Sequence, residues 1–199
     1  MATTQLGSIY QYGDGVPTDE AEAIRWYVRA ADRGEVGAMN RLGMAYANGT
    51  GVSQNDSEAL RWYRKAADGG LPYAMFNLGN VYAQGLGTLK DQGEAIRWYM
   101  KAADARLLDA MNEIGVIYAN GEGLRTDQDE ATRWFRKAAD LGYVPAMFNL
   151  GIRYSLGMGV SKDQREGQKW LEKAASLGSK EAKLFLANPK RKVQYERWL

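Results

Sequence analysis

The residues with the clearest chemical potential in this 199-residue chain are carboxylates that recur in close clusters. Two of these clusters are formed by Asp19, Glu20 and Glu22 and by Asp127, Asp129 and Glu130. Paired carboxylates can act as acid and base in a hydrolase. These clusters, however, stand where helices are predicted to begin, and carboxylates at a helix start cap free N–H groups and suit the helix dipole. We therefore interpret them as structural and predict that the chain is not an enzyme.

The amino-acid composition excludes several other kinds of catalytic and metal-binding site. The chain contains no His and no Cys, so it has no imidazole base, no thiol nucleophile and no thiolate or imidazole ligand for a metal. The Gly-x-Gly at Gly49 and Gly51 lacks the preceding strand and the third glycine of a dinucleotide-binding loop. We therefore predict no cofactor and no metal site. The absence of Cys also leaves the redox compartment open.

Basic residues form two columns at the repeat spacing. The first column is Arg25, Arg61, Arg97, Arg133 and Lys169, and the second is Arg29, Lys65, Lys101, Lys137 and Lys173. A basic ladder can bind nucleic acid or anionic lipid. Acidic residues accompany both columns at helical spacing, as Glu22 and Asp32 do in the first copy, which indicates a solvated face of ion pairs. The net charge is only +2, and no apolar run approaches the roughly 18 residues of a membrane span. We therefore predict no nucleic-acid partner and no membrane insertion.

All of these residues are positioned by a unit that repeats every 36 residues. Trp recurs at Trp26, Trp62, Trp98, Trp134 and Trp170, and Tyr recurs at Tyr10, Tyr46, Tyr82, Tyr118 and Tyr154. No insertion breaks this register between residues 2 and 187. Self-similarity at such a period is the signature of a stacked repeat architecture. The aromatic stripe is therefore interpreted as core rather than as a surface that stacks nucleic-acid bases.

Each repeat predicts two helices. In the second copy, Ala38, Leu42 and Tyr46 form a helical stripe, and Gly49 ends this first helix in the left-handed conformation that glycine tolerates. The second helix is predicted to begin at a capping box, in which an Asp or Asn caps the helix and a Glu three residues on reaches back to it. The N-caps are Asp19, Asn55, Asp91, Asp127 and Asp163, and their partners are Glu22, Glu58, Glu94, Glu130 and Glu166.

A lone helix pair cannot bury its Trp, Tyr and Leu side chains, so successive pairs must stack. Glycines of the first helices are expected to admit the large Trp; they are Gly7, Gly43, Gly79, Gly115 and Gly151. Methionines of the inner copies are expected to pack between repeats; they are Met39, Met75, Met111 and Met147. Arg106 replaces a turn glycine of other copies. A left-handed conformation costs a non-glycine residue about 1 kcal/mol, so either the turn is remodelled or something compensates.

The repeated pattern A-x-x-x-L-G-x-x-Y-x-x-G-x-G-V-x-x-D-x-x-E-A-x-x-W-Y-x-K-A-A-x-x-G resembles the Sel-one-like repeat, a longer relative of the tetratricopeptide repeat. The resemblance covers residue 2 to about 187. It implies an all-α fold, a right-handed α/α solenoid of tandem 36-residue helix–turn–helix repeats. It also implies scaffolds, adaptors and receptors, among them bacterial signalling, secretion, host-contact and toxin-immunity proteins. Partners of the family are usually proteins, and no common catalytic residue comes with it.

We predict a single solenoid domain over residues 2–188, followed by a tail or cap at 189–199. Its repeats are placed at 2–37, 38–73, 74–109, 110–145 and 146–181, with a partial repeat at 182–188. The tail is predicted to cap the last repeat by inserting Trp198 or Tyr195, and the alternatives are a basic docking tail or a disordered one. The abrupt start of the first repeat also fits one structural segment of a longer repeat scaffold.

The candidate binding surface is the concave groove, which the first helix of each pair lines if the geometry is tetratricopeptide-like. The residues predicted to face a partner are Asn40, Arg41, Met44, Phe76, Asn77, Asn80, Asn112, Glu113, Val116, Phe148, Asn149 and Ile152. Phe76 and Phe148 lie off the core stripe, and exposed apolar side chains framed by amides are typical of an interface core. A row of Asn can also pair with an extended backbone. The alternative is that these side chains only fill gaps between repeats.

The sequence therefore predicts a protein–protein interaction module of the adaptor, host-contact or toxin-immunity type. Its protein partner is not identified by the residues. The compartment also stays open, because a soluble chain of this kind fits the cytoplasm and equally a processed exported protein.

Overall fold

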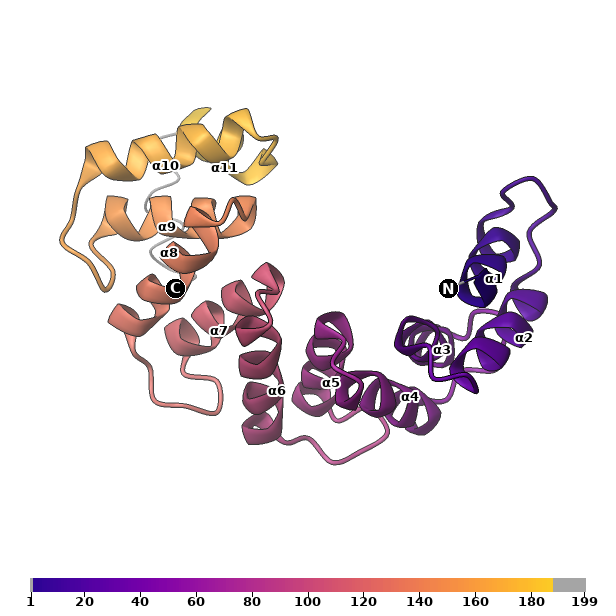
Figure 1. Cartoon of the computed structure of the whole chain (residues 1–199). Coiled ribbons are helices and arrows are strands. Elements are labelled where there is room, and N and C mark those ends of the chain that lie inside the picture. Colours follow the sequence, from indigo (N-terminus) through magenta and orange to yellow (C-terminus); the bar gives the residue numbers. More distant parts are fainter. Residues whose placement is uncertain (1, 188–199) are drawn as a thin grey trace. The chain divides into compact units, whose positions relative to one another are not determined.

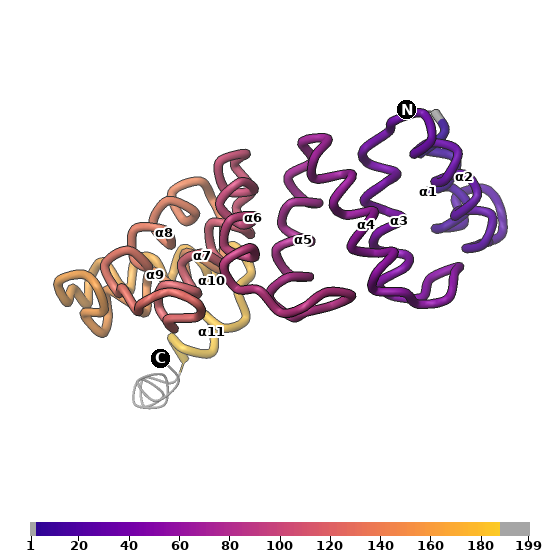
Figure 2. Tube along the Cα trace, turned by 90° about the horizontal axis from the view of Figure 1, so that it is seen from below, coloured from indigo at the N-terminus to yellow at the C-terminus, as the bar shows by residue number. Residues whose placement is uncertain are grey.

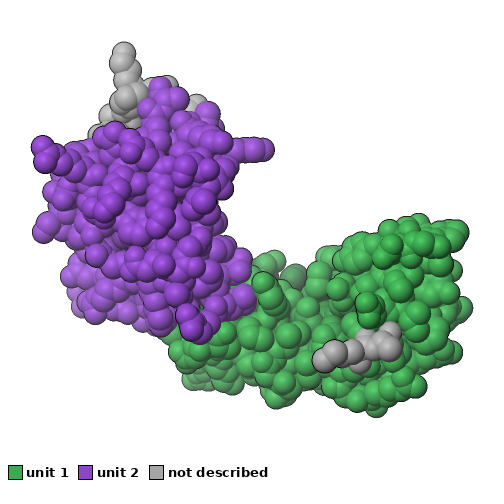
Figure 3. Space-filling model, turned by 45° about the horizontal axis from the view of Figure 1, so that its top comes forward, with its two compact units in different colours: residues 1–105 green, residues 106–199 purple. Residues whose placement is uncertain are grey.

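The computed structural model describes residues 2–187, which form eleven α-helices and no strand within that range (Figures 1 and 2). The chain divides into two compact units, residues 1–105 and 106–199 (Figure 3). Unit 1 contains α1 (Ala2–Tyr12), α2 (Glu20–Ala31), α3 (Val36–Asn48), α4 (Asp56–Asp68), α5 (Pro72–Gln84) and α6 (Gln92–Asp104). Unit 2 contains α7 (Leu108–Asn120), α8 (Gln128–Asp140), α9 (Val144–Leu156), α10 (Gln164–Ser176) and α11 (Lys180–Ala187).

The predicted all-helical repeat architecture is confirmed. Within each unit, every helix packs against the next helix along the chain, so each repeat supplies a pair and each pair rests on its neighbour (Figure 1). The single domain over residues 2–188 stays a prediction. The predicted tail, with Tyr195 and Trp198, lies outside the described residues.

The second helices begin where predicted, but only half of each capping box forms. Asp19 Oδ1 accepts from the Glu22 backbone N–H at 2.9 Å, and Asn55 Oδ1 accepts from the Glu58 N–H at 3.1 Å. The N-cap's own N–H donates instead to a tyrosine carbonyl of the first helix, as from Asn55 to Tyr46 at 2.8 Å. The predicted bond from this N–H to the glutamate side chain is therefore not formed.

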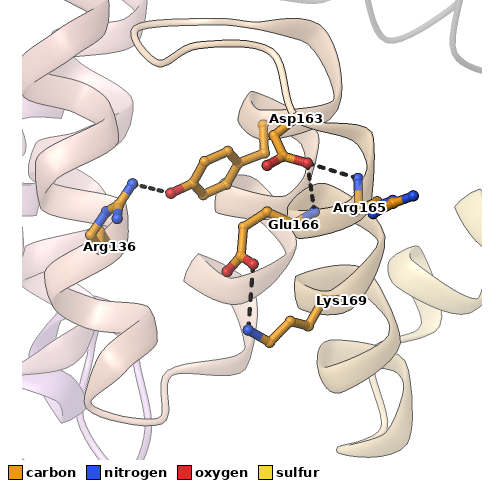
Figure 4. A network of polar contacts seen from close by, with 6 residues as sticks. Arg136, Asp163, Arg165, Glu166 and Lys169 are labelled. Carbon is orange, nitrogen blue, oxygen red and sulfur yellow. Dashed lines mark hydrogen bonds and ion pairs between the residues drawn. The ribbon is translucent and has the colours of Figure 1, made fainter.

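Each of these glutamates forms an ion pair with the basic residue three positions on. The pairs are Glu22–Arg25, Glu58–Arg61, Glu94–Arg97, Glu130–Arg133 and Glu166–Lys169. Figure 4 shows the last copy, where Asp163 caps the helix and Glu166 reaches Lys169 at 3.4 Å. The first basic column is therefore the solvated, ion-paired face that the spacing predicts.

The second basic column has a different role from the ion pairs predicted for it. Lys101 Nζ lies 3.7 Å from the centroid of the Trp98 ring, and Lys65 Nζ lies 4.6 Å from that of Trp62. The same arrangement recurs at Arg29 over Trp26, Lys137 over Trp134 and Lys173 over Trp170. A cation over an indole face is attracted by the ring quadrupole, so this column covers the outer side of the tryptophans.

Glycines of the first helices do allow close approach, but the side chain that enters is a tyrosine rather than a tryptophan. A Cβ on Gly43 would lie 2.5 Å from Tyr63 Cδ1, and a Cβ on Gly79 would lie 2.5 Å from Tyr99 Cε1. The equivalent contacts are Gly7 with Tyr27, Gly115 with Phe135 and Gly151 with Leu171. The prediction for Trp is wrong because Trp precedes this residue by one position, which turns it about 100° around the helix.

The tryptophans bridge successive pairs instead. Trp62 of α4 is buried with Leu42 of α3 and Tyr27 of α2, and Trp98 of α6 is buried with residues of α4 and α5. Met39 packs against both of these clusters, which confirms its predicted place between repeats. These two indoles are therefore sheltered by the pair before them, and this contact couples neighbouring repeats.

The turn after α6 is not remodelled. Arg106 has φ 64°, and among residues 2–187 it is the one non-glycine residue with a positive φ. Its equivalents Gly34, Gly70, Gly142 and Gly178 have φ between 82° and 100°. Arg106 therefore keeps the left-handed conformation of the glycine turns, which costs a non-glycine residue about 1 kcal/mol.

Candidate protein-binding surface

The predicted groove residues lie on first helices and divide between the two units. The unit 1 surface consists of Asn40, Arg41 and Met44 of α3 with Phe76, Asn77 and Asn80 of α5. The unit 2 surface consists of Asn112, Glu113 and Val116 of α7 with Phe148 and Asn149 of α9. Ile152 was also predicted to face a partner, and this is wrong. It is only 2% exposed, and an apolar side chain buried in the unit's own core cannot reach another protein.

An asparagine pair joins consecutive first helices in each unit. Asn77 Nδ2 donates to Asn40 Oδ1 at 3.1 Å in unit 1, and Asn149 Nδ2 donates to Asn112 Oδ1 at 3.0 Å in unit 2. Each pair therefore fills part of the gap between repeats, which was the alternative to partner binding. An amide has two donors and a carbonyl with two lone pairs, so one such bond leaves further capacity on both residues.

Phe76 and Phe148 are half-buried rather than exposed, which corrects the expectation that they protrude. The Phe76 ring lies 5.5 Å from the Tyr99 ring of α6, and the Phe148 ring lies 6.4 Å from the Phe185 ring of α11. These distances are typical of packed aromatic pairs. Each ring is thus partly covered by an aromatic residue of the chain itself.

Two large exposed side chains of unit 1 are Tyr12 and Met44, at 68% and 45% exposure. Arg41 lies beside them, with its guanidinium 6.0 Å from the Tyr12 ring and 5.7 Å from the Tyr27 ring. Sequence reasoning missed Tyr12, although a signal was present. The equivalent positions are Asn48, Gln84, Asn120 and Leu156, so an aromatic residue occurs there in the first copy alone.

A small pocket opens next to these residues in unit 1. Its volume is about 60 Å³, and it lies between the end of α1, the start of α2 and the end of α3. Arg41 and Met44 contribute to its wall together with Tyr12, Gln11 and Glu20. Sites for cofactors and small-molecule substrates are roughly 300–1,000 Å³, so this pocket is smaller than such sites.

The unit 2 surface carries a carboxylate in an unfavourable place. Burial raises the pKa of Glu113, and the neighbouring charge of Glu122 raises it further. A carboxylate that loses water and gains no cation favours its neutral form. Close by, Phe148 and Asn149 border an open depression of about 510 Å³ that α9 shares with α11.

The carboxylates that suggested acid–base chemistry act as caps and ion-pair partners. Asp127 accepts from the Glu130 N–H at 2.9 Å, and Glu130 lies 3.0 Å from Arg133. Over residues 2–187, no three His, Cys, Asp or Glu side chains are arranged to hold a metal ion. In the same part of the chain, no helix has the length and apolar character needed to cross a membrane.

Comparison with known proteins gives a consistent picture of the fold. The Sel1 repeat model matches five times, at residues 1–35, 36–71, 72–106, 108–143 and 144–179. A Sel1 repeat protein from Oxalobacter formigenes is 37% identical, with a TM-score of 0.86 over 90% of this chain and 74% of that one. The protective antigen c5321 of uropathogenic Escherichia coli is 32% identical, with a TM-score of 0.86 over 91% of this chain and 39% of that one.

More distant structures share the fold alone. The immunity protein Pa5087 from Pseudomonas aeruginosa is 23% identical, with a TM-score of 0.61 over 93% of this chain and 68% of that one. No curated protein matches the chain.

Proposed function

This chain belongs to the Sel1 repeat family, and from that premise we propose that it binds a protein partner through the exposed residues of its first helices. Sel1 repeats form a protein-interaction scaffold. The chain's own chemistry agrees with that role, because its carboxylates are used as caps and its basic columns are used in ion pairs and over indole rings. We propose that it has no catalytic activity.

The observation that carries the proposal is the group of Tyr12, Arg41 and Met44 in unit 1. Tyr12 and Met44 are large and exposed, and the Arg41 guanidinium lies near the rings of Tyr12 and Tyr27. Tyr, Arg and Met are enriched at the centre of protein interfaces, where aromatic and guanidinium groups supply most of the binding energy. The same three residues have no catalytic or metal-binding use, so contact with another protein is the role that fits them best.

Glu113 supports the proposal from unit 2. A half-buried carboxylate with a raised pKa weakens the folded state at neutral pH, and such groups cluster at functional sites. A cation on the partner would restore the favourable environment that residues 2–187 do not provide. We therefore place Glu113 in the contact surface of unit 2.

Adaptor, host-contact and immunity-type roles are all forms of this proposal. The structures named as immunity proteins support the fold only, because they are about a fifth identical to this chain. A second candidate, a structural segment of a longer repeat array, is supported by c5321, of which this chain covers 39%. The two candidates differ in one respect, since a spacer does not need the first-helix surface to be intact.

The test compares two variants of the purified chain as baits for proteins in native lysate. The surface variant carries Arg41→Ala, Met44→Ala, Glu113→Ala and Val116→Ala. The control variant carries Arg25→Ala, Arg61→Ala, Arg97→Ala and Arg133→Ala, which remove exposed ion pairs of little energetic value. Circular dichroism must show that both variants keep the helical content of the wild type.

We expect a partner that the wild type and the control retain and the surface variant loses. Mass spectrometry identifies that partner, and calorimetry with purified components then measures the loss of affinity. A partner held equally well by the surface variant would remove the first helices from the contact surface and favour the spacer role.

A further inference from the structure

The guanidinium of Arg41 makes long contacts to neutral partners in unit 1. Its Nη1 lies 3.4 Å from Gln11 Oε1 and 3.4 Å from the Tyr12 hydroxyl. Gln11 Oε1 is already engaged at 2.7 Å by the Tyr27 hydroxyl. By contrast, Arg25 reaches a carboxylate at 2.8 Å. Arg41 is thus oriented by its surroundings but is not neutralised by them.

The pocket next to Arg41 is open because one of its lining residues is smaller than its counterparts in later copies. Ala45 lines it, and the equivalent positions in later copies are Val81, Ile117 and Arg153. In unit 2 the corresponding space is occupied by the chain's own Arg153, whose guanidinium contacts Gln128, Thr132 and the Phe135 ring. The small Ala45 leaves this space open in unit 1, and a planar, forked group of about that size fits it.

The charges on the pocket wall decide whether a carboxylate or a guanidinium fits there better. The pocket wall includes the cation of Arg41 and the carboxylate of Glu20, together with the polar side chains of Asn48 and Thr50. Glu20 is exposed, so water screens its charge, whereas Arg41 is half-buried and is screened less. Charge-assisted bonds from a guanidinium to a carboxylate are among the stronger polar contacts, and they are often bidentate.

From these contacts we infer that the pocket beside Arg41 binds an Asp or Glu side chain of the partner protein. Residues next to that carboxylate would lie against the exposed Tyr12 and Met44, which gives an acidic segment with an apolar neighbour as the ligand class. This inference rests on the proposed function, because it names what the unit 1 surface recognises.

The test uses a library of random 12-residue peptides displayed on phage and selected on the full chain. Enriched peptides are synthesised, and their affinities are measured by fluorescence anisotropy at low and high salt. The variants are Arg41→Gln, Ala45→Ile and the control Arg61→Gln. Ala45→Ile fills the pocket with a residue that the fourth copy carries at the same position, so the fold is expected to accept it.

We expect enriched peptides to contain Asp or Glu next to an apolar residue. Replacing that acid by its amide should weaken binding about tenfold or more, as should Arg41→Gln, and the two changes together should add little. Ala45→Ile should also weaken binding, Arg61→Gln should not, and salt should reduce the affinity.

Three results would overturn the inference. They are peptides whose binding is unaffected by Arg41→Gln, basic peptides whose binding depends on Glu20, and a selection that enriches nothing. Each of them leaves the proposed function standing, because that proposal is tested with whole partner proteins and with both surfaces altered.

Discussion

Arg153 of α9 donates from Nε to Thr132 Oγ1 of α8 at 2.6 Å, inside the core of unit 2. The two residues are 2% and 3% exposed. The guanidinium also donates to the Gln128 carbonyl at 2.9 Å and lies 5.4 Å from the Phe135 ring. Burial lowers the pKa of Arg153 to about 10, so it is still charged at neutral pH. The core of unit 2 therefore holds a cation through neutral acceptors, which compensate only part of its lost hydration.

Because of this hydrogen bond, replacing Thr132 and replacing Arg153 are predicted to lower the free energy of unfolding by different amounts. Thr132→Ile should lower the free energy of unfolding by about 1–3 kcal/mol, because it leaves a buried donor without its acceptor. Arg153→Ile should cost less, since Thr132 can still donate to the Gln128 or Met158 carbonyl. The double variant should be close to the wild type, because an apolar pair can replace a buried polar one. Urea unfolding of all four proteins gives the coupling energy, and simple additivity would contradict the argument.

The features that the sequence predicted correctly are those that recur in every copy of the repeat. Helix pairs, N-caps and glycine turns depend on neighbours along the chain, so one copy is enough to recognise them. The second half of the capping box was wrong because its N–H donor is taken by a residue of the preceding helix, as Asn55 is by Tyr46. Such a competing contact is not visible in the spacing.

The candidate surface was predicted less well because its members meet across different helices. Arg41 lies beside Tyr12 of the previous repeat, and Phe76 lies against Tyr99 of the following helix. Comparing equivalent positions does not show which residues touch. It does show departures from the pattern, and both Tyr12 and Arg153 are departures of this kind.

Strain at Arg106 predicts a stabilising substitution. Its φ of 64° costs a non-glycine residue on the order of 1 kcal/mol, so Arg106→Gly should raise the free energy of unfolding by up to that amount. The reverse change, Gly142→Arg, should lower it similarly. No atom lies within 4 Å of a Cβ placed at Gly142, so that variant isolates the backbone effect. Thermal unfolding followed by circular dichroism checks both, and a loss of stability in Arg106→Gly would exclude strain at this turn.

Overpacking is predicted where tyrosine meets the first-helix glycine. A Cβ at Gly79 would lie 2.5 Å from Tyr99 Cε1, so Gly79→Ala should destabilise the fold by about 1–3 kcal/mol and Gly79→Leu by more. Gly37 of α3 has open space around its Cβ position. Gly37→Ala should therefore be neutral or stabilising by up to about 1 kcal/mol, through helix propensity alone. If Gly79→Ala and Gly37→Ala unfold at the same denaturant concentration, the contact between Gly79 and Tyr99 does not limit how closely α5 and α6 approach each other.

Tyr63 predicts a loss of stability in alkali. Burial raises its pKa to about 12, above the ordinary value of 10.0. The unfolded chain therefore releases this proton first, and the stabilisation present below pH 10 is lost as the pH rises towards 12. Two units of pKa correspond to about 2–3 kcal/mol. The free energy of unfolding should fall less steeply in Tyr63→Phe over this range, and absorbance at 295 nm should show one fewer late-titrating phenol.

Glu113 predicts the same sign of pH dependence at the acid end. Its raised pKa means that the folded state binds the proton more tightly than the unfolded chain does. Below the ordinary pKa of 4.5, the shift therefore does not lower the free energy of unfolding. The free energy of unfolding falls as the pH rises from there through the raised pKa. Glu113→Gln should be more stable than the wild type at pH 7, and the difference should vanish in acid.

Glu122 separates the two causes of this shift. Glu122→Gln removes the neighbouring charge but leaves the burial of Glu113 unchanged, so it should lower the Glu113 pKa only in part, because burial is the larger cause. Carbon-13 NMR titration of the Glu113 carboxyl measures the pKa in the wild type and in this variant. A pKa at the ordinary value in the wild type would remove the unfavourable carboxylate from unit 2, and with it the reason to expect a cation on the partner at this position.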